Sequence, residues 1–314
     1  MKSYINGNYF VTIYERTGTK EYRALRSGED FEAEFPDSID LKITDKCSIG
    51  CPFCHESSTP QGQEGNLIEI KRVLSQLPNY PIEIALGGGD LLESPTLSAS
   101  VIDWLKEDQK KIVAGTFNIK SLLKVTKGSA QSRVVKSLDN IGVSITRKPT
   151  EEELNSICRV IPIATNVVYH VILGIISPKD LKDLLRFAPY RCLGILILGY
   201  KQFGRGKSMN PLSPKLIQEY LNVFSEFGQE RLHIVNKNTR VHRSIGFDNL
   251  ALEQLNLKNY IHPLIWERLF LGEEFTNTMY VDAVKGEFAP TSRSTERVSW
   301  NDIGIIDYFK QNHR

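Results

Sequence analysis

The most constraining feature of this 314-residue sequence is a regular alternation of short apolar runs with longer amphipathic stretches. Seven runs rich in Ile and Val have the length of strands, at 39–44, 82–88, 110–117, 141–146, 167–174, 193–199 and 231–236. Segments of helical character lie between these runs, and three of them start at a proline, which costs little at the first helical position. The pattern predicts parallel strands covered by helices, as a β/α barrel or a doubly wound sheet.

The two ends of the chain do not follow this alternation. Two β-prone runs flank Thr17-Gly18-Thr19 and predict a hairpin. After about residue 240 the alternation stops, and a second hairpin is expected at Lys285-Gly286. We therefore expect three parts, which are an N-terminal β-hairpin at 1–36, the β/α unit at 37–240 and a C-terminal α+β extension at 241–314.

The charge balance and hydropathy argue against several classes of partner. The 39 Lys and Arg residues against 37 Asp and Glu residues give a net charge of +2, which argues against bulk attraction to nucleic acid or anionic membranes. No stretch approaches the ~20 consecutive apolar residues of a membrane helix. The N-terminus has neither the basic nor the apolar region of a signal peptide. We expect a cytoplasmic protein with no membrane and no nucleic-acid partner.

Five cysteines are present, and three of them crowd into eight residues directly after the first run of the β/α unit: Cys47, Cys51 and Cys54. An odd number with this clustering suits a reducing compartment better than a disulfide framework. Spacings of four and three residues let one loop place three thiolates around a cubane and leave the fourth iron open. Phe53 is expected to shield such a cluster from water. The alternative is a structural zinc site with a fourth ligand from Cys158 or Cys192.

The segment Cys47-Ser-Ile-Gly-Cys51-Pro-Phe-Cys54 resembles the signature of the radical S-adenosylmethionine (SAM) superfamily. After the next strand, Gly88 and Gly89 resemble the glycines of the family's Gly-Gly-Glu-Pro motif, with Asp90 in place of glutamate and no proline. The resemblance implies a partial (β/α)6 TIM-like barrel. It also implies a [4Fe-4S] cluster on the three cysteines, SAM on the open iron, and Gly88 to Asp90 near the methionyl ammonium.

Further positions on the fourth, fifth and sixth strands match places where the family contacts SAM: Ser144, Thr146, Asn166, His170 and Leu198. Three residues after the sixth strand are candidates for substrate contact or catalysis: Tyr200, Lys201 and Arg205. Plain alternatives stay open for each group. They are ordinary strand hydroxyls, a hydrogen-bonded core histidine and a basic solvent loop.

The resemblance implies an enzyme that cleaves SAM reductively to a 5′-deoxyadenosyl radical, which takes hydrogen from a substrate carbon. Peptide or protein modification is the favoured use, with an external one-electron reductant of the flavodoxin or ferredoxin type. The alternatives are a small-metabolite or nucleoside-modifying enzyme, a glycyl-radical-enzyme activase, or a non-catalytic zinc-binding β/α protein. No cysteine follows Cys192, so no auxiliary cluster is expected. Cys158 and Cys192 are expected to be buried structural residues.

Overall fold

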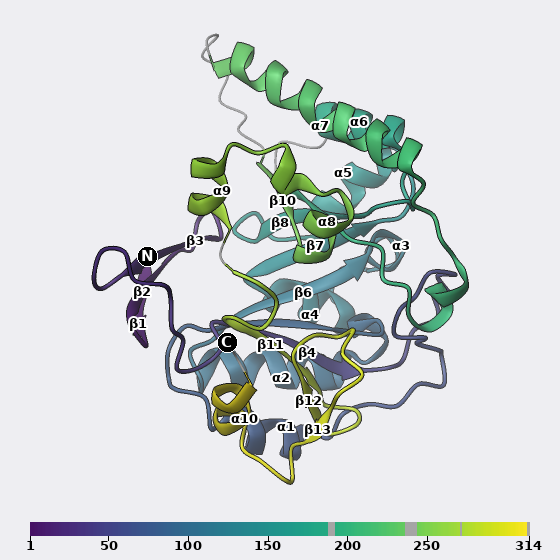
Figure 1. The fold of residues 1–314 in the computed structure, drawn as a ribbon. Coiled ribbons are helices and arrows are strands. Elements are labelled where there is room, and N and C mark those ends of the chain that lie inside the picture. The colour runs from purple at the N-terminus through teal and green to yellow at the C-terminus, as the bar shows by residue number, and fades with distance from the viewer. Residues whose placement is uncertain (188–191, 236–243, 271, 313–314) are drawn as a thin grey trace.

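The computed structural model describes residues 1–187, 192–235, 244–270 and 272–312 (Figure 1). Its largest feature is a ten-stranded sheet in the order β10-β9-β8-β7-β6-β5-β4-β11-β12-β13. Six consecutive neighbours are parallel: β4 (Ser38–Thr44), β5 (Glu83–Gly88), β6 (Ile112–Asn118), β7 (Asn140–Ile145), β8 (Asn166–Ile172) and β9 (Cys192–Leu198). They coincide with six of the seven predicted strands. Because no pairing among the described strands closes the sheet, the predicted partial (β/α)6 barrel is confirmed.

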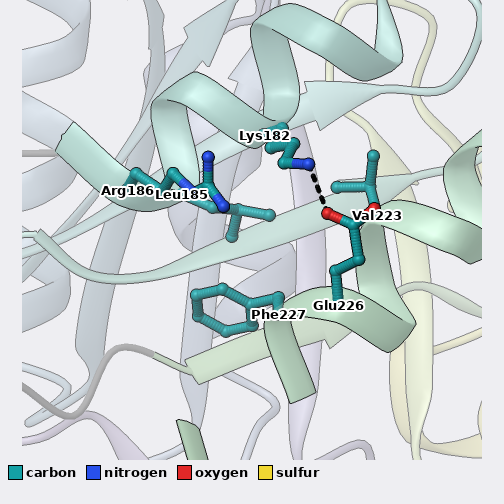
Figure 2. Close-up of a pocket in the computed structure, with 6 residues that line it drawn as sticks. All are labelled: Lys182, Leu185, Arg186, Val223, Glu226 and Phe227. Atoms are coloured by element: carbon teal, nitrogen blue, oxygen red, sulfur yellow. Dashed lines mark ion pairs between the residues drawn. The ribbon is translucent and has the colours of Figure 1, made fainter. Parts of the chain in front are cut away.

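Helices connect these strands, as expected for parallel neighbours. They are α1 (Leu67–Leu74), α2 (Pro95–Glu107), α3 (Ile119–Leu122), α4 (Ala130–Ser137), α5 (Glu151–Val160), α6 (Pro178–Phe187) and α7 (Pro214–Val235). The segment of helical character between the predicted strands at 110–117 and 141–146 forms two helices, α3 and α4, because Gly128 takes φ +84° in the turn before the Ser129 N-cap of α4. A pocket of about 10 Å³ between α6 and α7, beside the Lys182–Glu226 ion pair, has room for about one water (Figure 2).

The seventh strand is not where the sequence predicts it. The apolar run at 231–236 continues α7 as far as Val235, and residue 236 lies outside the described residues. A short apolar run cannot be distinguished from a helical segment by periodicity alone. The strand that pairs in parallel with β9 is instead β10 (Ser244–Phe247). The predicted boundary between residues 240 and 241 also lies outside the described residues.

The N-terminal hairpin is confirmed and gains one strand. β2 (Tyr9–Tyr14) pairs with β3 (Thr19–Ala24) as predicted, and β1 (Lys2–Asn6) adds a third antiparallel strand. One buried carboxylate, Asp37, joins this small sheet to the start of β4. Its oxygens accept hydrogen bonds from Tyr4 Oη at 2.9 Å, Tyr9 Oη at 2.6 Å and Asn6 Nδ2 at 2.8 Å. The small sheet therefore packs on the main one through a satisfied polar cluster.

The C-terminal region contributes to the main sheet. β11 (Thr278–Asp282) pairs in parallel with β4, and the predicted hairpin joins β11 to β12 (Glu287–Ala289), with β13 (Val298–Ser299) beyond it. The remaining elements are η3 (Leu257–Asn259) and the helices α8 (Asn249–Gln254), α9 (Pro263–Leu269) and α10 (Ile305–Asn312). Figure 1 shows α10 near α1, at the end of the chain, and the Ile305 N–H donates to Gln76 Oε1. None of the described helices is long and apolar enough to cross a membrane.

Candidate active site

The loop between β4 and α1 carries the three clustered cysteines at the carboxyl edge of the parallel strands. Backbone hydrogen bonds join the start of this loop to residue Thr59 farther along it. The Cys47 N–H donates to the Thr59 carbonyl at 2.9 Å, and the Thr59 N–H donates to the Asp45 carbonyl at 3.1 Å. Gly50 supplies the left-handed turn between the first two cysteines, with φ +68°. Cys47, Cys51 and Cys54 are free thiols and all are partly exposed.

The donor chemistry of this loop fits an iron–sulfur cluster. Burial raises the pKa of the Cys47 and Cys51 thiols, and the charge of Cys54 raises both further. Across the described residues, no three His, Cys, Asp or Glu side chains converge tightly enough to hold a single metal ion. A cubane does not need such convergence, because each cysteine binds its own iron at a separate corner.

A second segment, η2 (Gly204–Ser208), lies against the cysteine loop and holds it through Arg205. The Arg205 backbone N–H donates to the Cys54 carbonyl at 3.0 Å, and its Nε donates to the Cys51 carbonyl at 3.0 Å. Its Nη1 reaches the Ser58 carbonyl at 2.8 Å. A Cβ on Gly204 would lie 2.4 Å from the His55 carbonyl oxygen. Arg205 thus has its contacts with the backbone of the loop, whereas the sequence analysis expects it to face a substrate.

The other two candidates after β9 also have protein partners. Tyr200 is 3% exposed, and its hydroxyl donates to the Gly206 carbonyl at 3.0 Å, which places the ring beneath η2. Lys201 is half-buried, and its Nζ donates to Ser292 Oγ of the C-terminal region at 2.8 Å. Of the three candidates, Lys201 is thus the one whose charged group contacts a side chain of the C-terminal region.

The glycine motif at the end of β5 packs directly against the first residues of the cysteine loop. Gly88 has φ +105°, and a Cβ there would lie 2.4 Å from the Thr44 carbonyl oxygen. A Cβ on Gly89 would lie 2.2 Å from the Lys46 carbonyl oxygen. Gly87, by contrast, has nothing within 4 Å of the space a Cβ would occupy. Gly88 and Gly89 therefore allow the backbone at the end of β5 to approach the backbone of the cysteine loop. Gly87 faces open space beside the end of β5.

The Asp90 side chain has its hydrogen-bond partners inside the protein. Its carboxylate caps the short helix η1 (Leu91–Glu93), accepting the Leu92 N–H at 3.0 Å and a hydrogen bond from the Ser121 hydroxyl. The side chain is buried, and burial raises the pKa of this carboxyl. The aspartate that replaces the family's glutamate at this position therefore has a structural role, as the cap of η1.

Several predicted cofactor residues share the inner face of the partial barrel. Ser144 on β7 and His170 on β8 are register neighbours, and both are partly exposed. The His170 ring covers Gly142, where a Cβ would lie 2.3 Å from ring Cε1, and burial lowers the pKa of His170 to about 4. Leu198 lies at the carboxyl end of β9, and Thr146 directly follows β7. These four residues thus lie near one edge of neighbouring strands.

Asn166 is the exception, because it begins β8 and lies at the opposite, amino edge of the sheet. Its Nδ2 donates to Asn140 Oδ1 and to the Glu15 carbonyl, both at 2.9 Å. Asn166 therefore ties β8 to the N-terminal sheet, and the structure does not bring it to the other candidates. Phe53 lies in the cysteine loop, partly exposed, with its carbonyl oxygen beside Gly206.

A buried charge cluster beneath the cysteine loop was not predicted. The Lys42 ammonium on β4 lies 2.8 Å from Asp45, 2.9 Å from Glu56 and 3.2 Å from Asp282 of β11. Burial raises the pKa of Glu56, but His55 and Lys42 outweigh it and hold that pKa well below its usual range. Glu56 follows Cys54 by two residues, so the cluster ties the loop to the C-terminal region.

Asn118 at the end of β6 was also missed. Its Nδ2 points to Cys51 Sγ at 3.9 Å, and its Oδ1 accepts the Lys120 N–H at 2.9 Å as the N-cap of α3. The sequence signal was an asparagine between a predicted strand and a predicted helix, which indicates a cap. That signal does not predict the contact of the Asn118 side-chain NH2 group with Cys51, which is 67 residues away in the sequence.

The chain was compared with protein-family models, curated proteins and solved structures. No protein-family model matches the chain. Among curated proteins, the chain is similar to a probable GTP 3',8-cyclase of Methanocaldococcus jannaschii, with 24% identity over 162 residues that make up 48% of this chain and 54% of the relative. The chain thus spans about half the length of the curated relative it matches.

Solved structures give a more extensive likeness. SuiB of Streptococcus suis bound to S-adenosylmethionine matches with a TM-score of 0.62 and 10% identity over 88% of this chain and 66% of SuiB. SuiB bound to the precursor peptide SuiA matches with a TM-score of 0.63 and 10% identity over 88% of this chain and 65% of that one. Native anSMEcpe with bound AdoMet and Cp18Cys peptide has a TM-score of 0.58 and 14% identity over 88% and 80% of the two chains. At such identities the likeness establishes the fold.

Proposed function

We propose that this chain, which shares its fold with the radical SAM enzymes SuiB and anSMEcpe, is itself a radical SAM enzyme. Cys47, Cys51 and Cys54 would hold a [4Fe-4S] cluster. Such a cluster, once reduced, supplies the electron that cleaves SAM to methionine and a 5′-deoxyadenosyl radical, which takes hydrogen from a substrate carbon. The observation that carries the proposal is the cysteine loop itself, which places three free, partly exposed thiols within eight residues at the carboxyl edge of a parallel sheet.

The residues of this chain would position the cofactor along the inner face of the sheet. Gly87 leaves the end of β5 open, so a ligand can approach the backbone there without meeting a side chain. Ser144 and Thr146 offer hydroxyls for hydrogen bonds, and Leu198 offers apolar contact. His170 is neutral at neutral pH, because burial lowers its pKa to about 4. A neutral imidazole both donates and accepts a hydrogen bond, and adds no positive charge beside a sulfonium.

We further propose that the substrate is a peptide or a protein side chain. The structural neighbours SuiB and anSMEcpe are each described with a bound peptide, and the fold covers 88% of this chain in both comparisons. Lys201 is the residue we assign to substrate contact, since it is partly exposed and follows the carboxyl end of β9 by three residues. An external one-electron donor of the flavodoxin or ferredoxin type would reduce the cluster. The alternative is a nucleotide substrate, which the name of the curated relative, a probable GTP 3',8-cyclase, suggests.

The test of the reaction class is anaerobic reconstitution with iron and sulfide, followed by reduction in the presence of SAM. We expect about four irons per chain and release of 5′-deoxyadenosine, measured by chromatography and mass spectrometry. Stoichiometric zinc with no nucleoside release would instead establish the zinc-binding alternative. For substrate class, co-expression with short peptides encoded beside the gene should give a mass change in one peptide. A mass change in GTP and none in a peptide would replace the peptide proposal with the nucleotide one.

A further inference from the structure

The amide of Asn118 has its orientation fixed by the local structure. The side-chain oxygen accepts the Lys120 N–H at 2.9 Å and caps α3, so the oxygen end of the amide is already committed. The nitrogen end must then point the other way, where Cys51 Sγ lies 3.9 Å from Nδ2. The assignment of oxygen and nitrogen therefore follows from the hydrogen-bond network, because the reversed amide would face one N–H with another.

Cys51 is held on its backbone side as well. Arg205 Nε donates to the Cys51 carbonyl at 3.0 Å, and the Cys51 carbonyl also accepts the Cys54 N–H at 3.2 Å. Among the described residues, Asn118 is the one side chain that donates a hydrogen bond to a sulfur of the cysteine loop. Since β6 and the loop come from separate parts of the sheet, this contact is a tertiary one between the barrel and the loop.

We propose that Asn118 is a positioning residue that donates an N–H···S hydrogen bond to the Cys51 ligand and makes the cluster easier to reduce. This inference rests on the proposed function. A hydrogen bond to a ligand sulfur stabilises the more negative, reduced state of the cluster and raises its reduction potential. Cleavage of SAM needs a reduced cluster, so the donor at Cys51 would ease the electron transfer that precedes it.

The decisive variant is Asn118→Ser, which keeps a capping oxygen for α3 but has no N–H to donate to Cys51. The matched control is Asn66→Ser, because Asn66 caps α1 in the same way, accepting the Ile68 N–H at 2.9 Å, and contacts no sulfur of the loop in the described residues. Both changes are neutral in charge, so neither alters the field at the cluster directly. Thermal unfolding of each variant reports whether the cap is retained.

The measurement is the midpoint potential of the reconstituted cluster, followed by electron paramagnetic resonance during a redox titration. We expect a more negative potential in Asn118→Ser, an unchanged one in Asn66→Ser, and equal iron content in both. An unchanged potential with full iron content overturns the inference and leaves the proposed function standing. Loss of iron in Asn118→Ser alone also overturns it, because Asn118 would then serve assembly. A wild-type chain that takes up no iron overturns the proposed function and this inference together.

Discussion

The two edges of the same parallel strands differ in which of their reactive groups lack a partner within the described part of the protein. At the amino edge, the N-terminal sheet covers the strand starts, and charges pair with one another, as in Lys20–Glu83 at 2.6 Å and Lys106–Asp139 at 2.8 Å. A cavity of about 320 Å³ there is lined by residues of both sheets. At the carboxyl edge, backbone hydrogen bonds and the ion pairs of Lys42 hold the cysteine loop, but thiols and a glycine are left open.

This difference separates stability from ligand binding within one fold. Polar groups that satisfy one another hold a structure together but offer nothing to a ligand. Donors that are held in place by backbone contacts, with their reactive atoms free, are prepared for a ligand. We therefore expect changes at the carboxyl edge to affect iron and chemistry, and changes at the amino edge to affect stability.

The largest effect should come from Cys51→Ala, which removes one cluster ligand. We expect loss of the [4Fe-4S] absorption and of 5′-deoxyadenosine release, measured after anaerobic reconstitution. The midpoint of urea unfolding of the apoprotein should change little, since the thiol is partly exposed. The matched control, Cys158→Ala on α5, should retain the iron. A Cys51→Ala chain with four irons would remove Cys51 from the proposed site.

The opposite edge is tested by Asp37→Ala. This change leaves the buried hydroxyls of Tyr4 and Tyr9 without their acceptor, whereas the Asn6 amide keeps the Phe35 carbonyl, and each orphaned hydroxyl costs about 1–3 kcal/mol. We expect the free energy of unfolding to fall by about 2–4 kcal/mol in urea titrations, with iron content per folded chain unchanged. Asp30→Ala, at an exposed position in the same segment, is the control. Loss of iron without loss of stability would contradict the separation of the two edges.

A smaller effect at the carboxyl edge is expected from Arg205→Gln, since the cluster ligands remain and only their support weakens. Loss of charged hydrogen bonds to the carbonyls of Cys51 and Ser58 should loosen the loop. We expect release of iron to a chelator to become about tenfold faster, equivalent to roughly 1.4 kcal/mol of support. Arg205→Lys should restore part of the effect. Lys207→Gln, in the same segment but exposed, should release iron at the wild-type rate.

The β/α unit was predictable because its signals are local. Runs of Ile and Val gave six strands within two residues of their ends, and the Cys47 to Cys54 spacing located the loop. The strand expected at 231–236 was wrong, because its apolar residues fit a helix equally well. Lys42 looked like an ordinary strand lysine, since Asp282 is distant in sequence and meets it only after β11 pairs with β4. Contacts of this kind depend on sheet order, which a single sequence does not encode locally.

The smallest effect concerns His170, a partly buried titratable group on the inner face. Its folded pKa of about 4 lies below the ordinary value of 6.5, because burial disfavours the charged ring. Between those pH values the unfolded chain binds a proton that the folded chain does not, so stability is fully present above pH 6.5 and falls as the pH falls toward 4. Water reaches part of the ring, which screens the penalty, so we expect a loss of about 1–2 kcal/mol.

His170→Gln should remove this part of the pH dependence, because the amide does not titrate. The measurement is the free energy of unfolding from urea titrations at several pH values between 4 and 7, compared with the wild type. Ser144→Ala, at the register neighbour of His170, should keep the wild-type slope. Equal slopes for His170→Gln and the wild type would mean that the ring is solvated like an exposed histidine. The inner face would then be wetter than its burial indicates, and the neutral imidazole assigned to the cofactor site would lose its physical basis.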